Sequence, residues 1–211
     1  MERRRFLELW RRCRCGACEA EAAAVFTELQ RRYDEPWRHY HTVAHIAYCL
    51  ERFDEVRDRL HQPDAVELAL WFHDAVYDPR ADDNEARSAA LALACLDEEA
   101  DPALRDRVRE LILATRHCVP PRDHDQRYLC DIDLCSFARP WALFLRDTRA
   151  LRAEKAFVPD AEFYPRRLRM LETLLARPHF FHTSAFRWRF EAAVRANLQR
   201  AVAALRARGY G

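Results

Sequence analysis

Apolar residues recur every three or four positions through most of this 211-residue chain. This spacing is typical of amphipathic α-helices, because positions three and four apart share one face of a helix. The chain has only three glycines, which leaves little material for tight hairpins or a Gly-rich phosphate loop. The pattern predicts helices at about residues 3–33, 41–60, 64–76, 84–96, 101–117, 127–138, 140–157, 162–176 and 184–208.

Polar residues and prolines separate these segments. Pro36 separates the first predicted helix from the second, and Asp64 is a plausible N-cap of the third. Pro120 and Pro121 place residues 118–126 in a loop. Gly16 could loosen the first helix, which is otherwise continuous in pattern.

The chain shows no internal repeat, low-complexity tract or linker. An all-α fold is therefore the expectation, with a single domain over residues 1–211. Within it, the N-terminal helix of residues 1–33 is expected to pack on a core formed by residues 34–211.

Charge and hydropathy exclude several classes of partner. The chain carries 35 basic and 34 acidic residues, a formal net charge of +1. This balance predicts no general attraction to a nucleic-acid polymer or an anionic membrane. No apolar run approaches the length of a membrane span, and the N-terminus lacks the apolar core of a signal peptide, so a cytoplasmic location is expected. The apolar C-terminal helices could form a homodimer face.

Eight cysteines require an interpretation. Cys13, Cys15 and Cys18 cluster in the stretch CRCGAC, but the chain has no clear second pair at a distance, which disfavours a zinc site. The remaining cysteines lie in apolar stretches and are interpreted as small buried hydrophobic residues in a reducing compartment. They are Cys49, Cys95, Cys118, Cys130 and Cys135.

Imidazoles and carboxylates interrupt the apolar helices. The stretch LALWFHDAVYD (68–78) places His73 and Asp74 side by side in a run that otherwise reads as a buried helix. His41 and His45 are four residues apart on one predicted helix, so both should project from the same face. A lone His-Asp dipeptide is a common coincidence, but the ordered set of such residues is more informative.

Two further segments add to this set. His117 ends a predicted helix, and Asp131 and Asp133 start the next in the stretch CDIDL. Burying such groups without partners costs several kcal/mol each, and a divalent cation would compensate His nitrogens and Asp oxygens together. Manganese, magnesium, iron, nickel and zinc all suit such ligands. The alternative is that these residues only cap helices and form hydrogen bonds.

This ordered set resembles the HD superfamily of metal-dependent phosphohydrolases, and most closely its compact bacterial branch. The resemblance covers nearly the whole chain after Tyr33 and implies an HD-type helical bundle. It rests on the motifs YDEPWRHYHTVAHI (33–46), LALWFHDAVYD (68–78), DDNEARSA (82–89), LILATRH (111–117) and YLCDIDL (128–134), and continues weakly through LRAEKAFVPDAEFYPRRLRML (151–171) to EAAVRANL (191–198).

The resemblance implies roles for individual residues. His117 matches a place where two-metal members supply an extra ligand, and His41 matches a His that donates a proton to the leaving oxygen. Asp131 competes with Asp133 for the last ligand position, and the family pattern favours Asp133. The implied metal ligands are His45, His73, Asp74 and Asp133.

Other residues have a functional and a structural interpretation. Asp78 could orient or deprotonate the attacking water, or could only end its helix before Pro79. Asn84 and Glu85 could lie beside the site and contact substrate, or could cap the helix that they open. Three arginines are candidates for binding a phosphate through their planar guanidinium groups. They are Arg38, Arg116 and Arg152.

The expected function is metal-dependent hydrolysis of a phosphate ester, a nucleotide or another small phosphorylated metabolite, by a metal-activated water. One alternative is a di-iron oxygenase, a chemistry that some HD-fold enzymes carry out. Another is a metal-stabilised regulatory or ligand-binding module with little turnover. The sequence leaves open the metal, its number and the oligomeric state.

Overall fold

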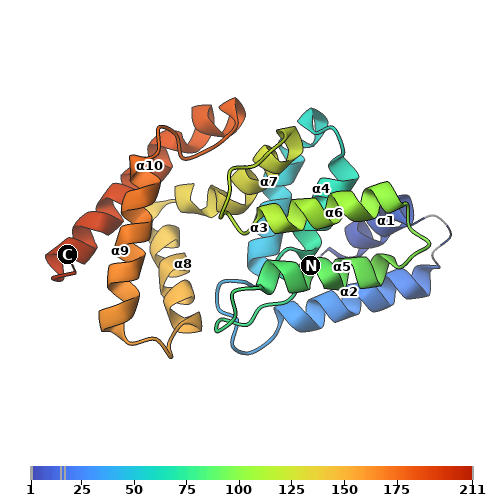
Figure 1. The fold of residues 1–211 in the computed structure, drawn as a ribbon, viewed down its shortest axis with the longest axis horizontal. Coiled ribbons are helices and arrows are strands. Elements are labelled where there is room, and N and C mark those ends of the chain that lie inside the picture. Colours follow the sequence, from blue (N-terminus) through green and yellow to red (C-terminus); the bar gives the residue numbers. More distant parts are fainter. Residues whose placement is uncertain (1, 15, 17, 211) are drawn as a thin grey trace. The chain divides into compact units, whose positions relative to one another are not determined.

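A computed structural model describes residues 2–14, 16 and 18–210 (Figure 1). All regular elements of this part of the chain are helices, so the all-α prediction is confirmed. In chain order they are α1 (Arg3–Cys13), α2 (Glu19–Tyr33), α3 (Val43–Asp54), the 3₁₀ turn η1 (Arg57–Arg59), α4 (Pro63–Phe72), α5 (Asn84–Leu96), α6 (Pro102–Ala114), α7 (His124–Leu134), the 3₁₀ turn η2 (Cys135–Ala138), α8 (Trp141–Glu154), α9 (Asp160–Ala176) and α10 (Ser184–Ala207).

The prediction of one helix over residues 3–33 is wrong. Helix α1 ends at Cys13 and α2 begins at Glu19. Gly16 lies between them with φ +91°, a left-handed conformation that interrupts a right-handed helix and that glycine adopts without steric cost. Cys18 is the N-cap residue of α2 and donates its backbone N–H to the Glu21 carboxylate, so its role is to start that helix. Cys15 lies outside the described residues.

Several other helix boundaries differ from the prediction. Helix α4 begins with Pro63 at its first position, so Asp64 lies inside the helix and is not its N-cap. The same helix ends at Phe72 instead of near Val76, which leaves His73 and Asp74 just beyond it. Helix α7 begins earlier than predicted, because the Asp123 carboxylate accepts a hydrogen bond from a backbone N–H of its first turn.

The chain divides into two compact units, residues 1–133 and 134–211. Helix α4 is the centre of the first unit and packs against α1, α3, α5 and α6. All of its residues from Ala65 to Phe72 are buried, which explains why this segment is apolar on every side. The Trp71 ring meets the Phe6 ring of α1 edge to face, with the ring centroids 5.3 Å apart, so α1 packs against this core.

Buried polar contacts fix α4 in this position. The Tyr33 hydroxyl at the end of α2 donates to the Trp71 carbonyl at 2.9 Å. The buried Asp125 carboxylate accepts the backbone N–H groups of His61 and Gln62, both at 2.9 Å, just before α4 starts. These bonds hold both ends of α4, and its C-terminal end carries the candidate site.

The second unit contains η2 and helices α8 to α10. Asn197 of α10 is buried and its side-chain amide donates to the carbonyls of Phe137 and Arg139, at 2.9 and 2.7 Å, which joins α10 to η2. The Glu191 carboxylate accepts the backbone N–H groups of Phe180 and Phe181 before α10 begins. Among the described residues, no helix combines the length and apolar character needed to cross a membrane.

Candidate metal centre

The centre lies in the first unit, where α4 ends. His73 is the C-cap of α4 and keeps a helical backbone, with φ −55° and ψ −36°. Asp74 follows it in the turn. His45 comes from the first turn of α3, and Asp133 comes from the last turn of α7. Three elements that are distant in sequence therefore supply the four predicted ligands.

The side chains of these four residues converge. His45 Nε2 lies 3.3 Å from His73 Nε2, 3.5 Å from Asp74 Oδ2 and 3.2 Å from Asp133 Oδ1. His73 Nε2 lies 3.1 Å from Asp74 Oδ2 and 3.6 Å from Asp133 Oδ1. Both imidazoles are almost completely buried, with 5% and 2% of the residue exposed for His45 and His73.

This spacing fits a shared cation. Nitrogen and oxygen ligands bind zinc or magnesium at about 2.0–2.2 Å, so two ligand atoms on one ion stand about 3.0 Å apart at right angles and about 3.4 Å apart at tetrahedral angles. The five measured separations, 3.1 to 3.6 Å, fall around these values. The two imidazoles and two carboxylates could therefore hold one divalent ion without a large rearrangement.

The hydrogen bonding of His73 prepares its ring for this role. Its Nδ1 lies 2.9 Å from the Leu70 carbonyl, which can only accept, so Nδ1 carries the hydrogen. A neutral His73 then has its lone pair on Nε2, the atom that faces the other ligands. Because His45 Nε2 is only 3.3 Å away, a cation or a proton must lie between these nitrogens for the contact to be favourable.

The electrostatics of the group agree with a buried cation site. Burial by itself would lower the pKa of His73, but the carboxylates of Asp74 and Asp133 outweigh it and hold that pKa well above its usual range. Burial likewise opposes ionisation of Asp133, yet the hydrogen bonds from His117, His45 and His73 keep its pKa well below the ordinary value. Burial also opposes ionisation of Asp74, but His73 and His41 outweigh it and keep the pKa of that carboxyl below its ordinary value. Both carboxyl groups therefore stay ionised, which suits a metal ligand.

Cys49 is a neighbour of the centre that the sequence pattern predicted only as a small buried residue. It is completely buried on α3, one turn after His45, and the ligand atoms of His45, Cys49, His73 and Asp133 all lie within 4.8 Å of one another. The structure thus contains a His–Cys–His–Asp group that could hold a metal ion. The spacing of four residues from His45 was the signal available in the sequence.

Asp74 is a better fourth ligand than Cys49. The Cys49 sulfur is 3.7 Å from His45 Nε2 and 3.9 Å from His45 Nδ1, nearly the same distance from both ring nitrogens. It therefore packs against the imidazole ring and is not placed along the line from Nε2 toward the other ligands. The Asp74 oxygen, in contrast, lies within 3.5 Å of both His Nε2 atoms.

His117 contacts the centre through Asp133. His117 Nε2 is 2.8 Å from Asp133 Oδ2, while Asp133 Oδ1 faces His45. His117 lies just after the end of α6 and has a positive φ of 54°. Its side chain points toward Asp133 of α7. Asp131, the competing candidate, is buried as well, but it does not belong to the group of ligand atoms around His45.

Arg38 stabilises the turn that contains Asp74. Its guanidinium is buried and donates to the carbonyls of Asp74, Ala75 and His41 at 2.6, 3.0 and 3.1 Å, and to the Glu35 carboxylate at 3.0 Å. These bonds occupy the donors that phosphate binding would require. In this structure Arg38 is a positioning residue, and its predicted role in substrate binding gains no support.

His41 lies before α3, not on it. The helix starts at Val43 with Thr42 as its N-cap, so the expectation that His41 and His45 share a helix face is wrong. The His41 ring nevertheless remains near the centre, with its centroid 6.3 Å from that of His45. It stacks on the Tyr77 ring at 4.2 Å, which fixes its plane.

Asp78 lies in the turn before α5, and Asn84 and Glu85 are the first two residues of that helix. The Asn84 side chain pairs with the Asp78 backbone through two hydrogen bonds of 2.9 Å, and Asp83, not Asn84, is the N-cap residue. The Asp78 carboxylate accepts the backbone N–H of Arg80 at 2.9 Å, which stabilises its own turn. Glu85 is half-buried in the first turn of α5. None of these described contacts joins the three residues to the metal ligands.

The two other candidate arginines differ from each other. Arg116 is exposed immediately before His117. Arg152 belongs to the second unit, and its guanidinium is engaged by the Asp160 carboxylate and the carbonyls of Lys155 and Val158. Arg116 therefore remains available to a phosphate, whereas the donors of Arg152 are already occupied.

Comparisons with protein-family models, with curated proteins and with solved structures found no match to this chain. The resemblance to the HD superfamily therefore stays a prediction, and a function for the chain has to be inferred from the geometry of the centre.

Proposed function

We propose that this chain is a metal-dependent hydrolase of phosphate esters, acting on a nucleotide or another small phosphorylated metabolite. The observation that supports it most directly is the convergence of His45, His73, Asp74 and Asp133, with five separations between 3.1 and 3.6 Å. A bound divalent cation would polarise a phosphoryl oxygen and lower the pKa of water, which is the chemistry that such hydrolysis requires.

The chain supplies the other groups that this reaction needs. His41 is next to the centre and can carry a proton to the leaving oxygen, with its ring plane held by Tyr77. Arg116 is exposed beside His117 and can neutralise phosphate charge. Asp78 is retained as a candidate for orienting water, although its carboxylate bonds to its own turn in this structure.

A metal assay and a turnover assay together test the proposal. Purified wild type should contain stoichiometric metal, and Asp74→Asn should lose it, because the neutral amide is a poor metal ligand. Asp78→Asn is the matched control and should keep its metal, since Asp78 has no described contact with the ligands. The wild type, tested with manganese, magnesium, iron, nickel and zinc, should release phosphate from some members of a nucleotide and sugar-phosphate panel.

Other outcomes would contradict the proposal. Absence of metal from both proteins would mean that a proton, not a cation, bridges His45 and His73. About two irons per chain without phosphate release would favour the di-iron oxygenase. Stoichiometric metal with no turnover under any condition would favour a regulatory module.

A further inference from the structure

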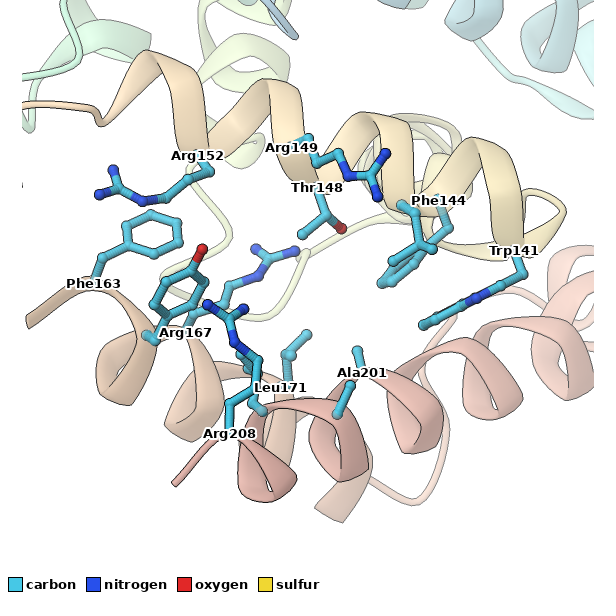
Figure 2. A pocket seen from close by; sticks show the side chains of 14 residues that line it. Trp141, Phe144, Thr148, Arg149, Arg152, Phe163, Arg167, Leu171, Ala201 and Arg208 are labelled. Atoms are coloured by element: carbon cyan, nitrogen blue, oxygen red, sulfur yellow. The ribbon is translucent and has the colours of Figure 1, made fainter. Parts of the chain in front are cut away.

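A cavity lies within the second unit, between α8 on one side and α9 and α10 on the other (Figure 2). Its volume is about 330 Å³, at the small end of the range for small-molecule sites, about 300–1,000 Å³. All residues that line it belong to the second unit. None of the candidate metal ligands contributes to it.

The walls of the cavity are mostly apolar. Trp141 and Phe144 of α8 stack at 5.4 Å, with 18° between their ring planes, and form one end. Leu171 of α9 and Ala201 of α10 lie opposite α8 (Figure 2). Because alanine is small, Ala201 leaves space between the helices that a larger side chain would fill. An apolar or aromatic body of matching size would gain from burial there.

The charged groups of the lining are all arginines, with no Asp or Glu among the lining residues. Arg152 is already used, since it bonds to Asp160 at 2.6 and 3.0 Å and to two carbonyls at the turn between α8 and α9. Its role is to hold that turn, so a ligand in the cavity has to be met by other arginines of the lining.

Two of these, Arg149 and Arg208, are exposed, whereas Arg167 is half-buried with its guanidinium over the Phe137 ring. Figure 2 shows them on opposite sides of the cavity, Arg149 on α8 and Arg208 after the end of α10. Within the described part of the chain, Arg149 has no hydrogen bond or ion pair through its side chain. Arg208 lies over the Tyr164 ring at 4.4 Å and interacts with the Tyr164 side chain, but forms no ion pair with a carboxylate of the described residues. Both are exposed, so their guanidinium groups can meet a ligand at the opening.

We infer that this cavity binds a small organic carboxylate with an aromatic or other apolar body. The planar carboxylate matches the fork of a guanidinium, and the body matches the aromatic wall of Trp141 and Phe144. A single anionic group at the opening suits the site better than several, because each charge placed among apolar walls loses hydration. The site is independent of the proposed phosphohydrolase activity.

Naphthoate is a suitable probe, titrated into the full chain by calorimetry beside the neutral naphthalenemethanol. We expect naphthoate to bind at least about tenfold more tightly, since a charge-assisted hydrogen bond contributes more than one tenfold step in affinity. Arg149→Leu and Arg208→Leu should each weaken naphthoate binding about tenfold. Arg146→Leu, an exposed arginine of α8 outside the lining, is the matched control and should bind like the wild type.

Ala201→Phe should abolish binding of both probes, because the larger side chain fills the cavity, and circular dichroism would verify that the variant folds. The inference is overturned if the wild type does not bind millimolar naphthoate, if naphthalenemethanol binds as tightly, or if both arginine variants bind unchanged. If Ala201→Phe misfolds, the naphthoate affinities of Arg149→Leu and Arg208→Leu still test whether the cavity binds a carboxylate.

Discussion

His117 and His45 contact opposite oxygens of one carboxylate: His117 Nε2 lies 2.8 Å from Asp133 Oδ2, and His45 Nε2 lies 3.2 Å from Asp133 Oδ1. With this arrangement His117 orients Asp133 from outside the group of ligand atoms. Removal of such a supporting partner typically lowers metal affinity without removing the site.

His117→Ala should therefore keep the metal stoichiometry of the wild type and weaken its affinity by about 10- to 100-fold. A chelator competition titration measures both quantities. His124→Ala is the control, because His124 Nε2 donates to the Arg59 carbonyl at 2.8 Å and does not touch the centre. A fall from two metals to one in His117→Ala would show instead that His117 binds a second ion.

Cys49→Ala and Cys49→Ser should both keep full metal content, because the Cys49 sulfur packs against the His45 ring, whereas the Asp74 oxygen is placed to act as the fourth ligand atom. Elemental analysis of the two variants, beside Asp74→Asn, is the measurement. If the Cys49 variants lost metal and Asp74→Asn retained it, the ligand assignment would have to be reversed.

Arg38→Met should destabilise the protein by about 2–4 kcal/mol, because it leaves buried carbonyls of the ligand turn without donors. Arg38→Lys should not restore stability, since an ammonium cannot reproduce the planar set of donors. Urea denaturation of metal-free protein gives these values.

Arg116→Met is the comparison for Arg38→Met. Arg116 is exposed, so its removal should change stability by less than about 0.5 kcal/mol but raise KM for the phosphorylated substrate. A wild-type KM in Arg116→Met would exclude Arg116 from substrate binding, and an unchanged stability of Arg38→Met would contradict the positioning role.

A pH dependence is expected from Asp123, which accepts two hydrogen bonds from Arg107 at 2.7 and 2.8 Å. These bonds lower the pKa of Asp123 to about 2. The unfolded-state pKa is about 3.9, so the pair contributes its full stabilisation above about pH 4 and loses it as the pH falls toward 2. The stability difference between wild type and Arg107→Met should therefore shrink over that interval.

Urea denaturation at a series of pH values between about 2 and 6 measures this difference. Arg109→Met, an exposed residue on the same helix, should show no such pH-dependent difference from the wild type. A difference between wild type and Arg107→Met that stays constant over the interval would mean that the Asp123 carboxylate does not respond to Arg107.

The sequence by itself determined that the chain is helical and which residues would be candidates for the centre. Helical periodicity is a local property, so α5 was predicted at its observed bounds of Asn84–Leu96. His73 and Asp74 were recognisable because a buried, apolar helix does not place an imidazole and a carboxylate at its end without partners. The sequence only suggested a helix break near Gly16, because its surroundings decide whether a glycine adopts a left-handed backbone conformation.

Only the tertiary structure decided how these candidates meet. Asp131 and Asp133 are two residues apart, about 200° around a helix, so one of them at most can face the centre, and packing of α7 selects Asp133. Cys49 and Arg38 acquired their positions in the same way, through contacts between elements that are distant in sequence. Side-chain direction and competition for partners are non-local, and no pattern within a single helix contains them.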